Sequence, residues 1–372
     1  MVKAIVMNKQ FSLDIYLNDG VRNIMTNAYK AAFSNPRESL FVYKMQKTFG
    51  KSEKIRRKFK EKENLHIPPF LISSISTDCN LACKGCYARS NNICGSHEKD
   101  KKEELTAEQW KVIFQEAAEM GINFNLLAGG EPMLRKDILK AASEVKNMIF
   151  PIFTNGTLIS ESHIDLFTEN LNLIPILSLE GCMESTDDRR GQGVFNRVVS
   201  SMELLKDRGL FYGTSITVTT ENIDLATSFS YVNLLKDLGC KIIFFIEYVP
   251  TEANTEHLAL DEKGIAKMES NLEKLRMTYE NIIFLSFPGD EKAMGGCLAA
   301  GRGFFHISPD GKAEACPFSP YSDSNIAEKG LKETLKSPFF ARLRDSGLVG
   351  GEHTGGCTLF EYEEEVKEML SK

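Results

Sequence analysis

Three cysteines near residue 80 carry the most specific chemical signal in the chain. They form the segment Cys79-Asn-Leu-Ala-Cys83-Lys-Gly-Cys86-Tyr87, with the spacing C-x3-C-x2-C. Three thiolates on one short loop can hold three irons of a four-iron cluster and leave the fourth iron without a protein ligand. An open position on a metal is where substrate chemistry can occur. A structural zinc site with Cys94 as its fourth ligand is the alternative.

Composition favours a metal or catalytic use of these thiols over a disulfide scaffold. The chain has 372 residues, an odd number of cysteines (nine) and a formal net charge of −6. Clustered cysteines in a reducing compartment more often bind metal or react than form disulfides. The charge provides no attraction to nucleic acid or anionic membrane. No apolar run reaches the roughly 18 residues of a membrane helix, and the apolar stretch at the N-terminus is too short for a signal peptide. We therefore expect a cytoplasmic protein with no nucleic-acid or membrane partner.

Alternating strands and helices must position the cysteine segment, which directly follows a predicted strand that begins at Phe70. The next helix begins after Thr106, which has with Gln109 the positions of a capping box. Five more apolar segments, separated by amphipathic ones, make six strand-helix units between about 70 and 262. Repeated units of this kind imply a parallel sheet. We predict an α/β fold, a partial (β/α)6 TIM-like barrel, with the cysteines at the carboxyl ends of its strands, where chemistry gathers in barrels.

The ends of the next strands carry small and polar residues. The second strand ends in Gly129-Gly130-Glu131-Pro132. Paired glycines let a ligand approach the backbone closely, and Glu131 offers an acceptor for an ammonium group. The third strand ends in Thr154-Asn155-Gly156 and the fourth in Ser178-Leu-Glu180-Gly. Each is typical of a turn when taken alone, and a plain turn remains the alternative for Thr154 and Asn155.

With these segments in order, residues 70–250 resemble the radical S-adenosylmethionine (SAM) superfamily, with its C-x3-C-x2-C-aromatic loop and GGEP segment. The resemblance implies that SAM chelates the open iron of a 4Fe–4S cluster through its amino and carboxylate groups. One-electron reduction of the cluster then cleaves SAM to methionine and a 5′-deoxyadenosyl radical, which abstracts a hydrogen from an unactivated C–H bond. It also implies an electron donor such as flavodoxin or ferredoxin. The cofactor performs the difficult chemistry, and the protein positions it.

The resemblance also assigns roles to single residues. Arg190 lies in a run similar to the family pattern S-(I/L)-D-G…D-x-x-R-G-x-G-x-F and is a candidate clamp for the SAM carboxylate. Glu180 replaces the usual Asp of that pattern, so its role stays open. The cluster ligands are Cys79, Cys83 and Cys86, and the expected SAM contacts are Tyr87 at the adenine, Gly129, Gly130 and Glu131 at the amino group, and Thr154, Asn155, Ser178 and Arg190.

A second group of cysteines lies near the C-terminus. Cys297, Cys316 and Cys357 stand in a Gly- and Cys-rich stretch whose segment 304–316 predicts a hairpin around Asp310-Gly311. This stretch is similar to SPASM and twitch domains, which hold auxiliary iron–sulfur clusters. Three cysteines fit a shortened, twitch-like domain with one auxiliary 4Fe–4S cluster. Its fourth ligand would be the substrate, another cysteine (Cys94, Cys182 or Cys240), His353 or a neighbouring carboxylate; buried structural cysteines or zinc are the alternative.

Two further residues are catalytic candidates. Glu247 ends the sixth strand, where it could act as a general base or anchor a substrate ammonium. Cys182 follows the fourth strand, where a thiol could return a hydrogen atom to a substrate radical, as in peptide epimerases of the superfamily. Cys240 precedes the sixth strand and is expected to pack in the core. Cys94 is expected to be incidental.

Changes in composition and in the pattern of predicted elements divide the chain into three parts. Residues 1–69 form a mostly helical extension, 70–287 the barrel and 288–372 a small β-hairpin/α domain that is twitch-like. In the extension, the stretch 51–65 carries seven Lys and Arg against three Glu. That pattern is typical of a solvated helix face, with a docking surface for an acidic partner as the alternative.

Three functions remain open at this point. The first is a radical SAM enzyme that crosslinks, epimerises or oxidises a peptide or protein side chain. The second is the same machinery acting on a small molecule, as a dehydrogenase or in cofactor biosynthesis. The third is a non-catalytic iron–sulfur or zinc protein. The intact GGEP segment and SAM-contact pattern favour the first two, and we expect an oxygen-sensitive, anaerobic enzyme with a peptide as the first choice.

Overall fold

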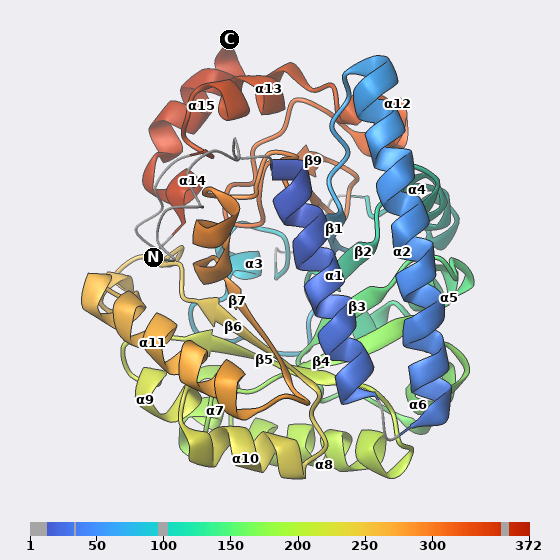
Figure 1. Ribbon diagram of the computed structural model, residues 1–372. Helices are drawn as coiled ribbons and strands as arrows, with labels where there is room; N and C mark the ends of the chain where they lie inside the picture. The colour runs from blue at the N-terminus through green and yellow to red at the C-terminus, as the bar shows by residue number, and fades with distance from the viewer. Residues whose placement is uncertain (1–12, 33–34, 96–102, 351–356) are drawn as a thin grey trace, which may run out of the picture.

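The computed structural model describes residues 13–32, 35–95, 103–350 and 357–372 of the chain. Within these residues, one curled sheet has the strand order β7-β6-β5-β4-β3-β2-β1-β8-β9 (Figure 1). Strands β1 to β7 pair in parallel, each with the next in the chain. The strands are β1 (Phe70–Ser74), β2 (Phe124–Ala128), β3 (Phe150–Thr154), β4 (Leu173–Ser178), β5 (Gly213–Val218), β6 (Ile242–Glu247), β7 (Ile283–Phe287), β8 (His306–Ile307) and β9 (Ala313–Glu314).

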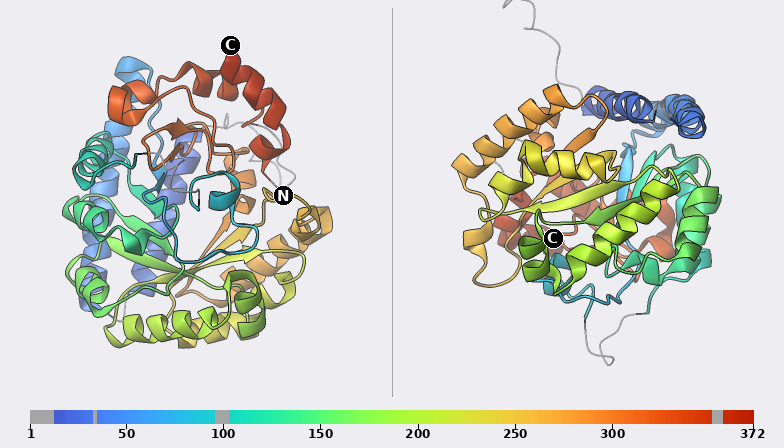
Figure 2. Two further views of the ribbon diagram at one scale, coloured as in Figure 1. Left: turned by 180° about the vertical axis from the view of Figure 1, so that it is seen from behind. Right: turned by 90° about the horizontal axis from the view of Figure 1, so that it is seen from below.

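Helices that connect the strands cover the outer face of the curl (Figures 1 and 2). The predicted capping box is confirmed, because the Thr106 hydroxyl accepts from the Gln109 amide and the Gln109 side chain accepts from the Thr106 amide. The helix that follows buries Trp110 and Phe114 against the sheet. The long outer helices are α4 (Ala107–Glu119), α5 (Lys136–Glu144), α6 (Glu161–Glu169), α8 (Val194–Asp207), α10 (Phe229–Asp237) and α11 (Glu262–Thr278). Shorter turns are α3 (Tyr87–Ser90), η2 (Pro132–Leu134), α7 (Met183–Arg190), α9 (Ile223–Ala226), η3 (Glu256–Leu258) and η4 (Gly289–Met294).

Two N-terminal helices, α1 (Leu13–Ala31) and α2 (Pro36–Glu63), lie side by side across the inner face of the curl (Figure 2). Their apolar residues, among them Met25 and Val42, form one buried cluster with inward residues of the strands such as Ile176 and Phe244. Burial of this apolar surface attaches the helices to the open side of the barrel. The basic stretch 51–65 lies on α2 and is largely exposed, as expected of a solvated face.

Among the Lys and Arg residues of that stretch, Arg56 is the one that is not exposed. It is buried, and its guanidinium donates to the Gly121 carbonyl, to the Asn123 side chain at 2.7 Å and to the Asn18 side chain. Charged hydrogen bonds of this kind fix the position of a helix better than apolar contact alone, because they are directional. Arg56 thus sets where α2 lies on the barrel.

Glu38, in the first turn of α2, is expected to make stability depend on pH. Its side chain borders the apolar interior and is 6% exposed, and burial raises its pKa to about 7 while Lys241 opposes the rise. The native state therefore keeps a proton that the unfolded chain releases, and stability falls as the pH rises from about 4.5 to about 7. Glu38→Gln should remove this slope and raise the free energy of unfolding at pH 8 by about 1–3 kcal/mol. Denaturant titrations at pH 5 and pH 8 measure it, with the exposed Glu61→Gln as control; equal slopes in both variants would contradict the assignment.

The sheet extends beyond the six predicted units at both edges. The segment 283–287, predicted as a strand within the barrel part but not counted among the six strand-helix units, pairs in parallel with β6 as a seventh strand. At the other edge the predicted hairpin is present, and β8 pairs in parallel with β1 while β9 is antiparallel to β8. Both additions supply partners for edge strands whose backbone groups would otherwise be exposed. The hairpin therefore continues the barrel sheet, and the three-part division of the chain stays a prediction.

The C-terminal helices pack above the hairpin and the outer end of α4 (Figure 1). They are α12 (Ile326–Thr334), α13 (Pro338–Asp345), α14 (Thr358–Glu361) and α15 (Glu363–Ser371). The Glu116 carboxylate of α4 accepts from the Leu331 amide at 3.0 Å, and the Arg342 side chain donates to the Met369 carbonyl at 2.7 Å. None of the helices that the structure describes combines the length and apolarity that crossing a bilayer requires.

Candidate functional site

The first cysteine group lines a cavity of about 440 Å³ that extends through the inside of the curl to the carboxyl ends of the parallel strands. Cys79, Cys83 and Cys86 lie on the loop that joins β1 to α3, and each is half-buried. Among the described residues, no three His, Cys, Asp or Glu side chains converge closely enough to hold a single metal ion. A four-iron cluster has a different requirement, because each thiolate binds its own iron. The donor set and its open side toward the cavity fit such a cluster.

Cys94 lies against this group, contrary to the expectation that it is incidental. It is buried beside Ala88 and Ile93, and its thiol donates a hydrogen bond to Cys86. That hydrogen bond is the main reason why the pKa of Cys86 falls to about 5. A cysteine must be a thiolate to bind iron, so this contact favours the ligating form of Cys86.

The glycines of the GGEP segment make room for the cysteine loop itself. Gly129 has φ +121°, and a Cβ there would lie 2.8 Å from the Ser76 carbonyl oxygen; a Cβ at Gly130 would overlap the Asp78 carbonyl. The two loops are joined by hydrogen bonds from the Gly130 amide to Ser76 O (2.8 Å) and from the Glu131 amide to Asp78 O (2.7 Å). A close approach to the paired glycines is therefore present, but the group that approaches Gly129 and Gly130 is backbone of the cysteine loop. Contact of these glycines with a ligand stays a prediction. Both glycines also border the cavity.

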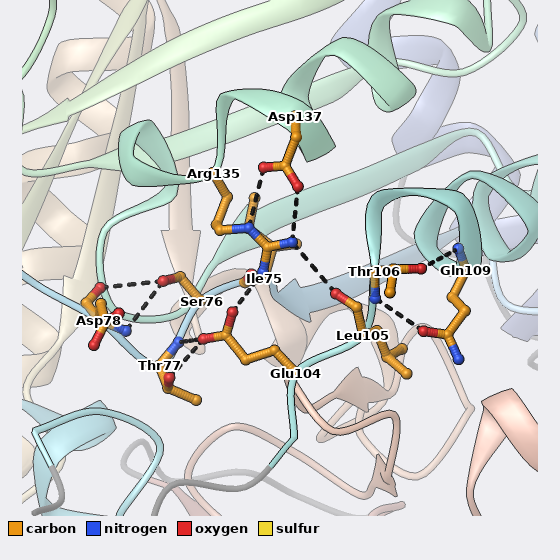
Figure 3. Close-up of polar contacts among 10 residues, drawn as sticks. All are labelled: Ile75, Ser76, Thr77, Asp78, Glu104, Leu105, Thr106, Gln109, Arg135 and Asp137. Atoms are coloured by element: carbon orange, nitrogen blue, oxygen red, sulfur yellow. Dashed lines mark hydrogen bonds and ion pairs between the residues drawn. The ribbon is translucent and has the colours of Figure 1, made fainter. Parts of the chain in front are cut away.

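A charged network holds the start of the cysteine loop from the opposite side (Figure 3). The Glu104 carboxylate accepts from the Thr77 amide at 2.6 Å and from the Thr77 hydroxyl at 2.5 Å. Arg135 donates to Glu104 at 2.5 Å and to both carboxylate oxygens of Asp137. Because Arg135 follows η2, the network ties the GGEP segment to Thr77, two residues before the first ligand cysteine.

Arg135→Met should lower the free energy of unfolding by about 1.5–3 kcal/mol, because it leaves the partly buried Glu104 carboxylate, and the exposed Asp137 carboxylate, without their charged donor. The loss should also loosen residues 76–78, so amide exchange there should accelerate. Arg208→Met is the matched control, because Arg208 also binds two carboxylates but on the exposed surface. Its cost should be about 0.2–1 kcal/mol. Similar losses in the two variants would show that the Arg135 network does not hold the loop.

Glu131 binds the end of the neighbouring strand. Its carboxylate accepts from the Thr154 hydroxyl (2.6 Å), the Asn155 amide (2.8 Å) and the Met133 amide (2.9 Å), and it is fully buried. Burial raises the pKa of Glu131, while these three donors oppose the rise. Glu131 is absent from the described residues that line the cavity. Contact with an ammonium group stays a prediction for Glu131; its observed contacts position Thr154 and Asn155.

Thr154 and Asn155 are more than a plain turn. Both line the cavity, and the Asn155 side-chain amide donates to Asn80 Oδ1 at 2.8 Å and lies 4.0 Å from the Cys79 sulfur. Hydrogen bonds to a ligating sulfur are one of the levers by which a protein tunes an iron–sulfur cluster. Asn155 therefore connects the end of β3 to the loop that carries the first cysteine.

Glu180, whose role the sequence left open, binds both neighbouring arginines. Its Oε1 lies 2.5 Å from Arg189 Nη1 and 2.5 Å from Arg190 Nη2, and its Oε2 accepts from the Thr217 amide at 3.0 Å. Burial alone would raise its pKa, but the two guanidiniums together hold the pKa of Glu180 below its ordinary value. Arg189 and Arg190 both line the cavity, so Glu180 orients two cations there. Arg190 thus stands where a carboxylate clamp is expected.

The remaining candidates divide into those at the cavity and those outside it. Ser178 lines the cavity with its hydroxyl 3.1 Å from that of Ser215. Tyr87 lines it as well, and its ring packs edge-on against Phe318 with centroids 5.2 Å apart. Glu247, buried at the end of β6, is also part of the lining. Cys182 begins α7 beside Ser185 and is absent from the described lining residues, so its hydrogen-donor role stays a prediction that this position does not support.

The second cysteine group assembles from three separate segments. Cys297 follows η4, Cys316 follows β9 and Cys357 precedes α14. The Cys316 thiol donates to Cys357, and Cys297 interacts electrostatically with both. Cys240 packs in the core, as expected, and burial raises its pKa to about 11. His353 lies outside the described residues. The juxtaposition of the three thiols fits an auxiliary cluster, with one iron left for another ligand.

Sequence reasoning missed the residues that hold the site together. Glu104 and Arg135 lie outside the recognised motifs, Arg189 occupies an unspecified position of the family pattern, and no periodicity marks any of the three. Glu180 was visible only as a departure from the family pattern, yet it has the densest set of charged contacts at the cavity. A departure within an otherwise intact motif was therefore the one available signal.

Known proteins give the same picture. The family model for the radical SAM superfamily matches residues 73–229. Fe-coproporphyrin III synthase of Methanosarcina barkeri is 29% identical over 221 residues, and the match covers 57% of this chain but only 53% of the synthase. AdoMet-dependent heme synthase of the same organism is 26% identical over 327 residues, covering 79% of this chain and 89% of that enzyme.

The fold recurs in solved structures. SuiB of Streptococcus suis, crystallised with its precursor peptide SuiA, superposes with a TM-score of 0.63 at 18% identity, covering 82% of this chain and 76% of SuiB. Radical SAM enzymes use a 4Fe–4S cluster and S-adenosylmethionine, and the relatives are enzymes, so the idea of a non-catalytic binding protein is set aside. The chain therefore carries a radical SAM domain over residues 73–229, and the curated relatives that it resembles are enzymes.

Proposed function

We propose that this enzyme modifies a side chain of a peptide or protein, by crosslinking, epimerisation or oxidation, and that an apolar group enters the cavity. The composition of the cavity wall carries the proposal. Inward residues of the strands and of α1, such as Ile176, Phe244 and Met25, make most of the wall. Among the described lining residues the cations are Arg189 and Arg190, both bound to Glu180, whereas Glu38, Glu247, Asp290 and Glu291 are carboxylates. Such a wall favours an apolar or cationic substrate over a polyanion.

The residues around the cavity would have different roles in binding the cluster and SAM. When bound, the cluster on Cys79, Cys83 and Cys86 and its SAM supply the 5′-deoxyadenosyl radical that abstracts the substrate hydrogen. Arg190 would bind the SAM carboxylate, held in place by Glu180. Ser178 and Tyr87 would contact the rest of SAM, and Gly129, Gly130, Thr154 and Asn155 would form the wall beside its amino group. Glu131 would hold Thr154 and Asn155 in place from behind that wall. The apolar wall would exclude water from the reacting carbon.

Glu247 would act on the substrate. It stands at the end of β6 and lines the cavity, and the ring of the next residue, Tyr248, lies against Gly85 of the cysteine loop. A carboxylate there would anchor a substrate ammonium or accept a proton. One auxiliary 4Fe–4S cluster on Cys297, Cys316 and Cys357, a cytoplasmic location and an electron donor such as flavodoxin or ferredoxin complete the proposal.

The test is substrate-dependent SAM cleavage. The anaerobically reconstituted, reduced enzyme would be incubated with peptides encoded beside its gene, and 5′-deoxyadenosine and peptide mass would be measured together. A peptide mass change that rises in step with 5′-deoxyadenosine supports the proposal. SAM cleavage that no peptide accelerates, but that a small molecule does, would overturn it.

A small-molecule substrate is the second candidate, since the match to a heme synthase covers 79% of this chain and 89% of that enzyme. Fe-coproporphyrin III carries several carboxylates, for which the cavity offers only two occupied arginines. Its binding is directly measurable, because the porphyrin absorbance shifts when the iron environment changes. A stoichiometric shift followed by a change in porphyrin mass that rises in step with 5′-deoxyadenosine would favour this candidate.

A further inference from the structure

A buried carboxylate lies against the second cysteine group. Glu291, on η4 directly after β7, is 2% exposed. Its carboxylate accepts from the amide of Leu298, the residue after Cys297, at 3.2 Å, and it interacts electrostatically with Cys297 and Cys357. Glu291 is thus a buried carboxylate beside the three thiols, and it comes from a segment that neither cysteine motif includes.

The surroundings of Glu291 do not neutralise a charge there. One carboxylate oxygen accepts from the Leu298 amide at 3.2 Å. The nearest cation, Arg302, instead directs its guanidinium to the backbone carbonyls of Cys297, Gly295 (3.0 Å) and Val349 (2.6 Å). No ion pair of Glu291 is found among the described residues. Buried carboxylates are normally paired with a cation or bound to a metal, because an isolated buried charge costs several kcal/mol.

Glu291 lies where the three thiolates of the second cysteine group would leave one iron without a ligand. The three thiolates provide for three irons, and a fourth iron needs one more donor. Glu291 lines the large cavity, whereas Cys297, Cys316 and Cys357 are absent from its described lining. The carboxylate therefore lies between the thiols and the cavity, on the side where the fourth iron would face.

We propose that the Glu291 carboxylate ligates the iron that Cys297, Cys316 and Cys357 leave without a thiolate, an inference that rests on the auxiliary cluster proposed above. Iron bound by a carboxylate oxygen differs chemically from iron bound by thiolate, because oxygen is a harder donor. The auxiliary cluster would then have one distinct iron, directed at the substrate cavity. Removing the carboxylate would make that iron labile and open to small ligands from the cavity.

The test uses the full chain with Cys79, Cys83 and Cys86 all replaced by alanine, so that only the auxiliary cluster contributes. Iron and sulfide are counted after anaerobic reconstitution with 57Fe, and Mössbauer and EPR spectra are recorded. We expect about four irons per chain with one iron distinct from the other three. In the same background, Glu291→Ala should lose that iron on mild oxidation and give a three-iron signal, and added imidazole should change its reduced spectrum. Glu291→Cys should make the four irons alike and shift the midpoint potential.

The control is Glu314→Gln, which removes another buried carboxylate two residues from Cys316, where Glu314 binds His306 at 2.7 Å. It should leave the spectra unchanged. Circular dichroism before reconstitution shows that each variant is folded, and Glu291→Gln, which keeps the shape of the side chain, replaces Glu291→Ala if the latter is not. Four irons whose spectra are the same with and without Glu291 would overturn this inference alone. A background chain that binds no iron would overturn the auxiliary cluster and the inference with it.

Discussion

Glu180→Gln is expected to lower the free energy of unfolding by about 3–5 kcal/mol, the usual cost of removing one partner from a buried ion pair. Glu180 is 1% exposed and binds two arginines and the Thr217 amide, so the neutral side chain would leave two partly buried cations without a counter-charge. The arginines would no longer be held at the cavity, so SAM affinity should fall as well. Thermal or denaturant unfolding and equilibrium SAM binding measure the two effects.

The matched control is Asp188→Asn on α7, the helix that carries both arginines. Asp188 pairs with Lys84 of the cysteine loop, but both side chains are about 70% exposed. Its loss should cost about 0–1 kcal/mol. The sign of the pH dependence provides a second check, because the pKa of Glu180 is lowered in the folded state. Its stabilising effect should be complete at neutral pH and disappear as the pH falls through that lowered pKa. Equal losses in the free energy of unfolding for Glu180→Gln and Asp188→Asn would show that the ion pairs of Glu180 with Arg189 and Arg190 do not hold the site.

Gly130→Ala should disrupt the cysteine loop and prevent the first cluster from forming. The added Cβ would overlap the Asp78 carbonyl, so the loops that the Gly130 and Glu131 amides join would have to separate. Overpacking of this kind costs about 1–3 kcal/mol, and the displaced loop carries Cys79. We expect iron content after reconstitution to fall by about four atoms per chain, which iron and sulfide assays would show.

Gly50→Ala is the control for that substitution. Gly50 lies inside α2, and a Cβ there meets no atom within 4 Å. It should stabilise the protein by about 0.5–1 kcal/mol, because alanine loses less backbone entropy in a helix. Full iron content in Gly130→Ala would show that the loops can separate without losing the cluster.

The sequence predicted those parts of the site that depend on local pattern. Cysteine spacing, paired glycines and strand-end residues are written in consecutive letters, and the parallel order of the strands brings them together. Glu131 shows the limit, because its motif position predicts contact with a ligand and its contacts show three donors from the protein. Which way a buried carboxylate turns depends on which donors the fold places nearby, and that information is not local.

The same limit applies to the edges of the sheet. The hairpin at 304–316 was predicted from its turn residues, but its pairing with β1 depends on which edge is free once the other strands have paired. Arg189 and Arg190 are adjacent and alike in sequence, and only the position of Glu180 shows that they act as a pair. The pairing of strands and of charged residues that lie far apart in the sequence could therefore not be predicted from local sequence patterns.

The pairing of Ile72 with His306 has a consequence for biosynthesis. At about 5–20 residues per second, β8 leaves the ribosome roughly ten to fifty seconds after β1. Until then the strand that leads into the first cysteine loop has a free edge, and so long a separation in sequence slows its closure. Cys316 and Cys357 are made later still. We therefore expect metal loading to follow release of the chain, so that a nascent chain arrested before residue 306 should acquire no stable iron.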